Sequence, residues 1–194
     1  MASPVLSHLV VNTSNYEPMK QWYLTVLEAE IGVESPTHSA CFLRTDETHH
    51  RLGLFNVAET DQSASMAQPG SQGPSVARLN HFAFEYPTLD KLFDAHAHLA
   101  DLAITPRIAL NHGPTMSIYY QDPDQNTVEL FYDNGYTEER LIEFFEAGHV
   151  LDGIPFDPAE LAKELEGGKP VAEVTAWSPR RSDSGRPSSS DGVS

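Results

Sequence analysis

The feature that most constrains the fold of this chain is a weak internal repeat. LSH at 6–8 matches LNH at 79–81 at an offset of 73 residues, and LGLF at 52–55 matches VELF at 128–131 at an offset of 76. Around these matches each half has the pattern of a strand, a helix and further strands. A unit this small cannot bury one face of a sheet alone, so we expect the two halves to pair.

Apolar periodicity and turn residues place the elements of each half. Alternating or β-branched apolar runs predict strands at 5–12, 40–44, 51–57, 78–86, 115–120 and 126–133, and helical spacing predicts helices at 14–30 and 88–102. The stretch between the halves is rich in Ser, Gln, Gly and Pro, which is typical of a linker. The predicted organisation is therefore a first module at 1–58, a linker at 59–77 and a second module at 78–135.

The last third of the chain has a different pattern. An amphipathic stretch at 137–148 predicts a helix, and so does the run at 157–168, where Asp157 precedes Pro158 and a glycine ends the run. We therefore expect C-terminal helices at 136–168. The remainder, 169–194, becomes rich in Ser, Pro, Gly and Arg from about 178 and is expected to be a disordered tail.

Composition limits the partners and the compartment. The chain has 12 Lys+Arg against 28 Asp+Glu, a net charge of −16 that disfavours nucleic acid as a partner. The single cysteine, Cys41, excludes an intrachain disulfide and a cysteine-based metal site. No window has the roughly 18 consecutive apolar residues of a membrane span, and the N-terminus lacks signal-peptide features. We expect a cytoplasmic, soluble protein with no membrane partner.

Three side chains at repeat-related positions are candidate metal ligands. His8 and His81 occupy matching points of the two first strands, and Glu129 interrupts an apolar strand whose repeat mate is Gly53. A lone histidine in an apolar strand is more often structural, and a lone glutamate more often solvated, but the repeat relates these positions. Two imidazoles and one carboxylate, with open positions, suit a non-haem Fe(II) ion that binds substrate and O₂ together.

Three motifs resemble one family. NHFAFE at 80–85, SIYYQDPDQNTVELF at 117–131 and FLRTDETHHRLGLF at 42–55 are similar to the vicinal oxygen chelate superfamily of glyoxalases, bleomycin-resistance proteins and extradiol dioxygenases. The resemblance covers about 5–133 and is greatest to the one-domain type I extradiol catechol dioxygenases. Gln125 replaces the glycine usual in the DPD turn, and we expect Asn126 to take the left-handed conformation there.

The resemblance implies both a fold and a metal. The fold class is α+β, with two paired βαβββ modules forming one open, barrel-like sheet around the metal site, plus the C-terminal helices. The implied cofactor is Fe(II), with His8, His81 and Glu129 as its ligands. We also expect a homo-oligomer, for which helical faces near 137–166 are the candidate contact.

Two further residues are candidates for substrate contact. Tyr119 lies ten residues before Glu129 across a hairpin turn, so the two side chains should be neighbours. By resemblance this tyrosine hydrogen-bonds the catechol oxygen, while Tyr120, with the opposite facing, is the alternative. His112, in the preceding loop, matches loosely a histidine that contacts substrate in the family; a loop histidine is otherwise usually solvated.

The histidine pair His49 and His50 is expected to serve acid–base chemistry. The resemblance implies a histidine on this strand beside O₂ and substrate, and an imidazole pKa near neutrality suits general acid–base catalysis. Alignment of the strand end favours His50. Strict alternation along the strand instead places His49 on the same face as Gly53. A bulge at the start of the strand would reconcile this result with the alignment that favours His50.

The function predicted from these features is an Fe(II)-dependent extradiol dioxygenase, which cleaves a catechol-type ring beside its two hydroxyls using O₂. One alternative is a glyoxalase-like isomerase or lyase. Such enzymes usually have a carboxylate where Gly53 stands, so Gly53 counts against it. Another is a non-catalytic protein of the same fold that binds an aromatic ligand.

Overall fold

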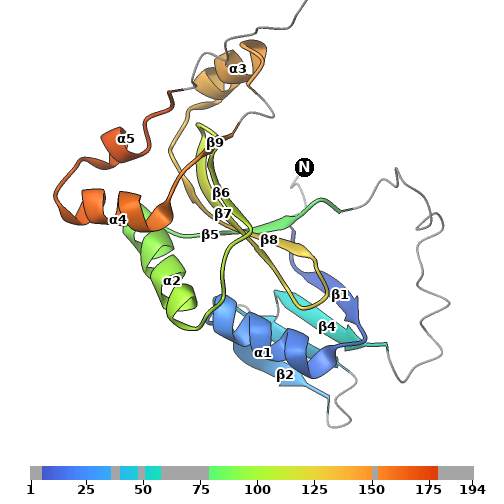
Figure 1. Ribbon diagram of the computed structural model, residues 1–194. Helices are drawn as coiled ribbons and strands as arrows, with labels where there is room; N and C mark the ends of the chain where they lie inside the picture. The colour runs from blue at the N-terminus through green and yellow to red at the C-terminus, as the bar shows by residue number, and fades with distance from the viewer. Residues whose placement is uncertain (1–5, 36–39, 48–50, 58–78, 150–152, 179–194) are drawn as a thin grey trace, which may run out of the picture.

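The fold is described from a computed structural model, which covers 6–35, 40–47, 51–57, 79–149 and 153–178. Within these residues the chain forms two βαβββ modules and a helical C-terminal part (Figure 1). The predicted α+β class is confirmed, with one difference: the strands form two open sheets, of four and five strands, instead of one continuous sheet. The predicted linker, 59–77, lies outside the described residues.

The first module contains one helix and four strands. Its elements are β1 (Leu9–Thr13), α1 (Tyr16–Val26), β2 (Glu30–Glu34), β3 (Ala40–Arg44) and β4 (Leu52–Asn56). The sheet order is β1-β4-β3-β2, with β1 parallel to β4 and the other pairs antiparallel. Met19, Tyr23 and Val26 recur at helical spacing, are buried, and belong to the core with Leu52 and Leu54 of the sheet. Helix α1 thus covers one face only.

The second module repeats this arrangement. Its elements are β5 (Phe82–Glu85), α2 (Leu89–Asp101), β6 (Ile108–Asn111), β7 (Thr115–Gln121) and β8 (Thr127–Asp133). The order β5-β8-β7-β6 matches the first sheet, and the two-residue strand β9 (Ile154–Pro155) extends the edge. Among the described strands, sequence periodicity did not identify β2, β6 and the two-residue β9.

Strand register confirms the repeat alignment. In the first sheet Gly53 lies between Val10 and Phe42. In the second sheet Glu129 lies between Ala83 and Tyr119. Gly53 and Glu129 therefore occupy equivalent central positions, as the 76-residue offset predicts.

A buried hydrogen bond joins the two modules. Tyr23 on α1 donates its hydroxyl proton to Asp122 Oδ2 at 2.7 Å, and both residues are inaccessible to solvent. Asp122 also accepts from the backbone N–H groups of Asp124 and Asn126, at 3.0 and 2.8 Å. The DPD turn is thus both a β7–β8 connection and the anchor for α1. The structure corrects one expectation here, because Gln125 itself, with φ of 68°, takes the left-handed conformation.

The C-terminal part packs on the second module. Helices α3 (Glu138–Glu146), α4 (Pro158–Glu166) and α5 (Val171–Val174) follow β8, and α4 lies beside α2 (Figure 1). Asp157 caps α4 by accepting from the N–H groups of Ala159 and Glu160, as its sequence predicts. The disordered tail was predicted to begin too early, because α5 forms within it and buries Val174. In the described part of the chain, no helix is long and apolar enough to cross a membrane.

Candidate metal centre and substrate site

Four of the predicted site residues meet on one face of the five-stranded sheet. His81 precedes β5, Tyr119 lies on β7 and Glu129 on β8, and the register places Tyr119 directly opposite Glu129. His81 Nε2 is 2.9 Å from Glu129 Oε2, and Tyr119 OH is 3.1 Å from Glu129 Oε1. His112 Nε2 lies 3.0 Å from the same hydroxyl. The hairpin thus makes Tyr119 and Glu129 neighbours.

The hydroxyl of Tyr119 is held in its protonated form. Burial, followed by the charge of Glu129 and the hydrogen bond to it, raises the Tyr119 pKa above its ordinary value. The single phenol proton goes to Glu129, so the phenol oxygen accepts its other hydrogen bond from His112 Nε2–H. The order of donors is therefore His112, Tyr119, Glu129. Tyr120, the alternative, is fully buried on the opposite face, where its hydroxyl meets His96 Nδ1 at 3.0 Å.

His81 and Glu129 fit two ligands of one ion. Ligand atoms about 2.1 Å from a metal and adjacent in its coordination sphere lie about 3 Å apart, close to the observed separation of 2.9 Å. Asn80 Oδ1 lies 2.8 Å from His81 Nδ1 and accepts a hydrogen bond from its N–H group. That contact leaves Nε2 as the coordinating atom and fixes the ring orientation. Sequence analysis missed Asn80, although it directly precedes His81 in the NHF motif.

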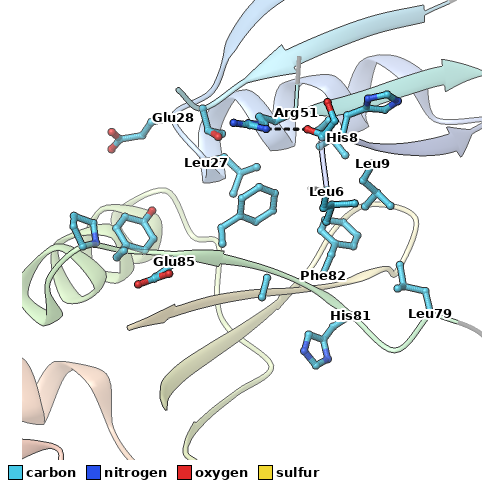
Figure 2. Close-up of a pocket in the computed structure, with 17 residues that line it drawn as sticks. Leu6, His8, Leu9, Leu27, Glu28, Arg51, Leu79, His81, Phe82 and Glu85 are labelled. Atoms are coloured by element: carbon cyan, nitrogen blue, oxygen red, sulfur yellow. Dashed lines mark hydrogen bonds between the residues drawn. The ribbon is translucent and has the colours of Figure 1, made fainter. Parts of the chain in front are cut away.

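His8, the third predicted ligand, does not join this pair within the chain. It lies just before β1, on the first sheet, with its ring edge-on to Phe42 at 6.5 Å between centroids. Figure 2 shows the imidazoles of His8 and His81 pointing away from each other, with Leu9 and Phe82 between them. Among the described residues, no three histidine, cysteine, aspartate or glutamate side chains are placed to hold one metal ion.

Three hollows border His81; one lies beside the DPD turn, and the other two differ in size and lining. The larger, about 840 Å³, lies between the modules and has mostly apolar walls, including Leu9, Leu27 and Phe82 (Figure 2). The smaller, about 310 Å³, is lined by His81, Ala83, His112, Thr115, Tyr119, Glu129 and Phe131. The smaller one is the candidate site, since it brings the carboxylate, the phenol and two imidazoles against an apolar wall.

The equivalent place in the first sheet leaves little room for a side chain. A Cβ atom at Gly53 would lie 3.0 Å from the ring of Phe42 and 3.1 Å from Val10. Gly53 is the residue equivalent to Glu129, and the ring of the neighbouring Phe42 lies close to the place where its side chain would begin. His49 and His50 lie outside the described residues, so the choice between them stays a prediction.

The C-terminal part of the chain borders the site on the His112 side. A Cβ atom at Gly153 would lie 3.2 Å from the His112 ring. Gly113, with φ of 89°, lies so close to the Phe144 ring that a Cβ atom would be 2.7 Å from it, and Phe144 packs in turn on Trp177. Sequence reasoning did not assign these residues to the site. Gly113, directly after His112, was the available signal.

Known proteins are similar to this chain, some in sequence and others in fold. Two dioxygenases from Rhodococcus globerulus, biphenyl-2,3-diol 1,2-dioxygenase 2 and 3, are 36% and 38% identical to it and are covered over 90% of their length, against 91% and 90% of this chain. Lactoylglutathione lyase from Agrobacterium tumefaciens has the same fold with a TM-score of 0.53 at 18% identity, over 70% of this chain and 100% of that one.

The two Rhodococcus globerulus relatives agree with the predicted enzyme class, that of a dioxygenase. A family model also matches residues 5–130, almost the range over which the motifs suggested a resemblance. The chain therefore belongs to the Glyoxalase/Bleomycin resistance protein/Dioxygenase superfamily.

Proposed function

We propose that this protein is an Fe(II)-dependent extradiol dioxygenase that cleaves a catechol-type ring, such as that of a biphenyl-2,3-diol, beside its two hydroxyls. The observation that carries the proposal is the convergence of His81, Glu129, Tyr119 and His112 on one hollow. The similarity to two biphenyl-2,3-diol dioxygenases supports the substrate class.

His81 and Glu129 would hold the iron, whereas His8, the third predicted ligand, lies apart from them on the first sheet. When bound, Fe(II) supplies Lewis acidity and passes charge between the diol and O₂. The single carboxylate of Glu129 leaves a net positive charge at the site, which favours a deprotonated diol oxygen nearby. Asn80 keeps the His81 ring in the orientation that binding requires.

Tyr119 would bind and orient the substrate. Its hydroxyl stays protonated, because its pKa is raised, and it borders the hollow beside Glu129. With the carboxylate engaged by metal, that proton is available to a diol oxygen. His112 donates to the phenol oxygen and so fixes the direction of the hydroxyl. His50 is the proposed acid–base group, with His49 as the alternative.

The test is anaerobic reconstitution with Fe(II), followed by O₂ and a panel of catechols that includes biphenyl-2,3-diol. We expect one O₂ consumed per diol and a yellow ring-opened product. Tyr119→Phe should retain iron but lower turnover by about 10²-fold, the typical cost of one lost donor in a site. Its neighbour on the opposite face offers a matched control, and Tyr120→Phe should leave turnover near the wild-type value.

Two results would refute the proposal. Nickel or zinc in the purified protein, without O₂ uptake on any diol, would favour an isomerase or lyase. Tight binding of the aromatic by metal-free protein, again without O₂ uptake, would favour a binding protein. The position where such isomerases and lyases usually have a carboxylate is Gly53 in this chain, and the Phe42 ring lies close to where a side chain would begin; both features speak against the first of these alternatives.

A further inference from the structure

Residues 136–178 lie beyond the range that the family model matches, and three of their segments meet at one loop. This loop, 111–114, runs from the end of β6 to the start of β7 and contains His112. Strand β9 pairs with the end of β6, where the loop begins (Figure 1). Phe144 of α3 packs against the loop, and Thr175, directly after α5, accepts a hydrogen bond from it. The C-terminal part thus contacts the loop from three separate elements.

Asn111 makes the hydrogen bonds that tie the loop to the C-terminal part. Its side-chain Oδ1 accepts from the backbone N–H of Gly113 at 2.8 Å, and its Nδ2 donates to the carbonyl oxygen of Thr175 at 3.1 Å. The side chain is buried, and an amide is costly to bury unless its polar atoms are paired. One end of the carboxamide therefore shapes the loop as an Asx turn, while the other end fixes it to the chain after α5.

The anchor at Thr175 is itself held in place. Helix α5 buries Val174, the residue before Thr175, in the hydrophobic core. Two residues after Thr175, the ring of Trp177 packs on Phe144 at 5.2 Å between centroids. The Thr175 carbonyl oxygen is therefore a fixed acceptor, and Asn111 transmits its position to the loop.

The loop in turn orients the His112 ring. The backbone N–H of His112 donates to the carbonyl oxygen of Thr115 at 2.9 Å, and a Cβ atom at Gly153 would lie 3.2 Å from Cε1 of the ring. From this position Nε2 lies 3.0 Å from the hydroxyl of Tyr119. Because a hydrogen bond weakens steeply when its angle is poor, a small shift of the loop would release the Tyr119 hydroxyl to turn.

We propose that Asn111 is a positioning residue, which uses the Thr175 carbonyl to hold His112 in the orientation that directs the Tyr119 hydroxyl proton. Asn111 acts through His112, since it is not among the described residues that line the candidate site. The effect on turnover rests on the proposed function, whereas the coupling of Asn111 to the His112 ring does not. The alternative is a purely structural role, in which the bond to Thr175 only stabilises the C-terminal part.

Two variants separate the two bonds of Asn111. In Asn111→Ser the hydroxyl can still accept from the Gly113 N–H, but it is too short to reach Thr175. Asn111→Asp keeps the shape and the acceptor, and its ionised carboxylate has no proton to donate. The matched control is Phe156→Leu, because the Phe156 ring packs the C-terminal part on Phe93 of α2, on the helix-covered side of the sheet.

The first measurement needs neither metal nor substrate. In metal-free, ¹⁵N-labelled protein, two-dimensional NMR spectra of the histidine ring nitrogens detect the Nε2–H of His112, and His112→Gln identifies its signal. The wild-type protein and Phe156→Leu should both show this signal. In Asn111→Ser and Asn111→Asp it should be lost or shifted, and the result is taken from whichever variant keeps the wild-type circular dichroism spectrum. A signal that is unchanged there, equally lost in Phe156→Leu, or absent from the wild-type protein would overturn the proposal.

Turnover then separates positioning from a purely structural role. After reconstitution with Fe(II), Asn111→Ser should lower kcat for catechol cleavage about 10-fold with iron content unchanged, a part of the roughly 10²-fold cost of losing a donor outright. In a Tyr119→Phe background the same change should have almost no further effect, because the hydroxyl that it directs is gone. Equal factors in the two backgrounds would leave Asn111 a structural role only and overturn the proposal.

The positioning role and the proposed function fail separately. If the His112 signal depends on Asn111 but the wild-type protein cleaves no diol, the coupling stands and the dioxygenase function is refuted. If a diol is cleaved and the His112 signal does not depend on Asn111, the function stands and the positioning role is overturned.

Discussion

The hydrogen bond between Tyr23 and Asp122 should be the most stabilising side-chain contact between the modules. Both side chains are inaccessible to solvent, and the O···O separation is 2.7 Å, which is typical of a strong bond to a carboxylate. A bond to a charged group contributes about 1.5–3 kcal/mol. In Tyr23→Phe, Asp122 Oδ2 keeps the Asn126 side-chain donor at 2.8 Å, so the carboxylate is not left without partners. We therefore expect a loss of about 2 kcal/mol, the middle of that range.

Tyr120→Phe provides the comparison. Tyr120 is also fully buried, but its hydroxyl partner is the imidazole of His96, and burial lowers the His96 pKa, which favours the uncharged ring. A bond between neutral groups contributes about 0.5–1.5 kcal/mol, so this variant should lose less. Both changes remove one hydroxyl from the core and leave the ring in place.

Equilibrium urea unfolding at one fixed protein concentration measures both losses. The slope with denaturant should be unchanged, because neither variant alters the surface exposed on unfolding. A cost for Tyr23→Phe equal to or below that for Tyr120→Phe would refute the argument that the DPD turn anchors the first module through a charged hydrogen bond.

Three further outcomes follow from single residues. Gly113→Ala should destabilise the protein by about 2–4 kcal/mol in thermal or urea unfolding, because backbone strain at positive φ adds to the clash with Phe144. Gly135→Ala is the control: Gly135 also has a positive φ but open space around it, so this change should cost about 1 kcal/mol. Burial lowers the His96 pKa below 6.5, and a smaller effect of Asp157 opposes this shift. The contribution of the neutral ring to stability is therefore present above pH 6.5 and is lost on acidification. Between pH 7 and pH 5, the free energy of unfolding should fall less for His96→Asn than for the wild-type protein. His50→Gln should slow turnover far more than it lowers iron content. A larger effect from His49→Gln would instead identify His49 as the acid–base group, as strict strand alternation predicts.

The duplicated architecture could be predicted from sequence because two offsets aligned strands in both halves. The register confirmed that Gly53 and Glu129 are equivalent, and the hairpin length predicted that Tyr119 would meet Glu129. Strands β2 and β6 were missed for physical reasons. Strand β2 contains a glycine and is interrupted by a register shift, while β6 has only four residues, so neither shows clear alternation.

The relation between His8 and His81 could not be predicted from equivalence alone. Two positions related by a repeat come together only if the modules close around an axis near both of them. Here the packing of Tyr23 on Phe82 and the bond to Asp122 set a different module arrangement. These contacts join residues far apart in sequence. Similarly, α5 was taken for part of a disordered tail, because its stability comes from burying Val174 and not from local composition.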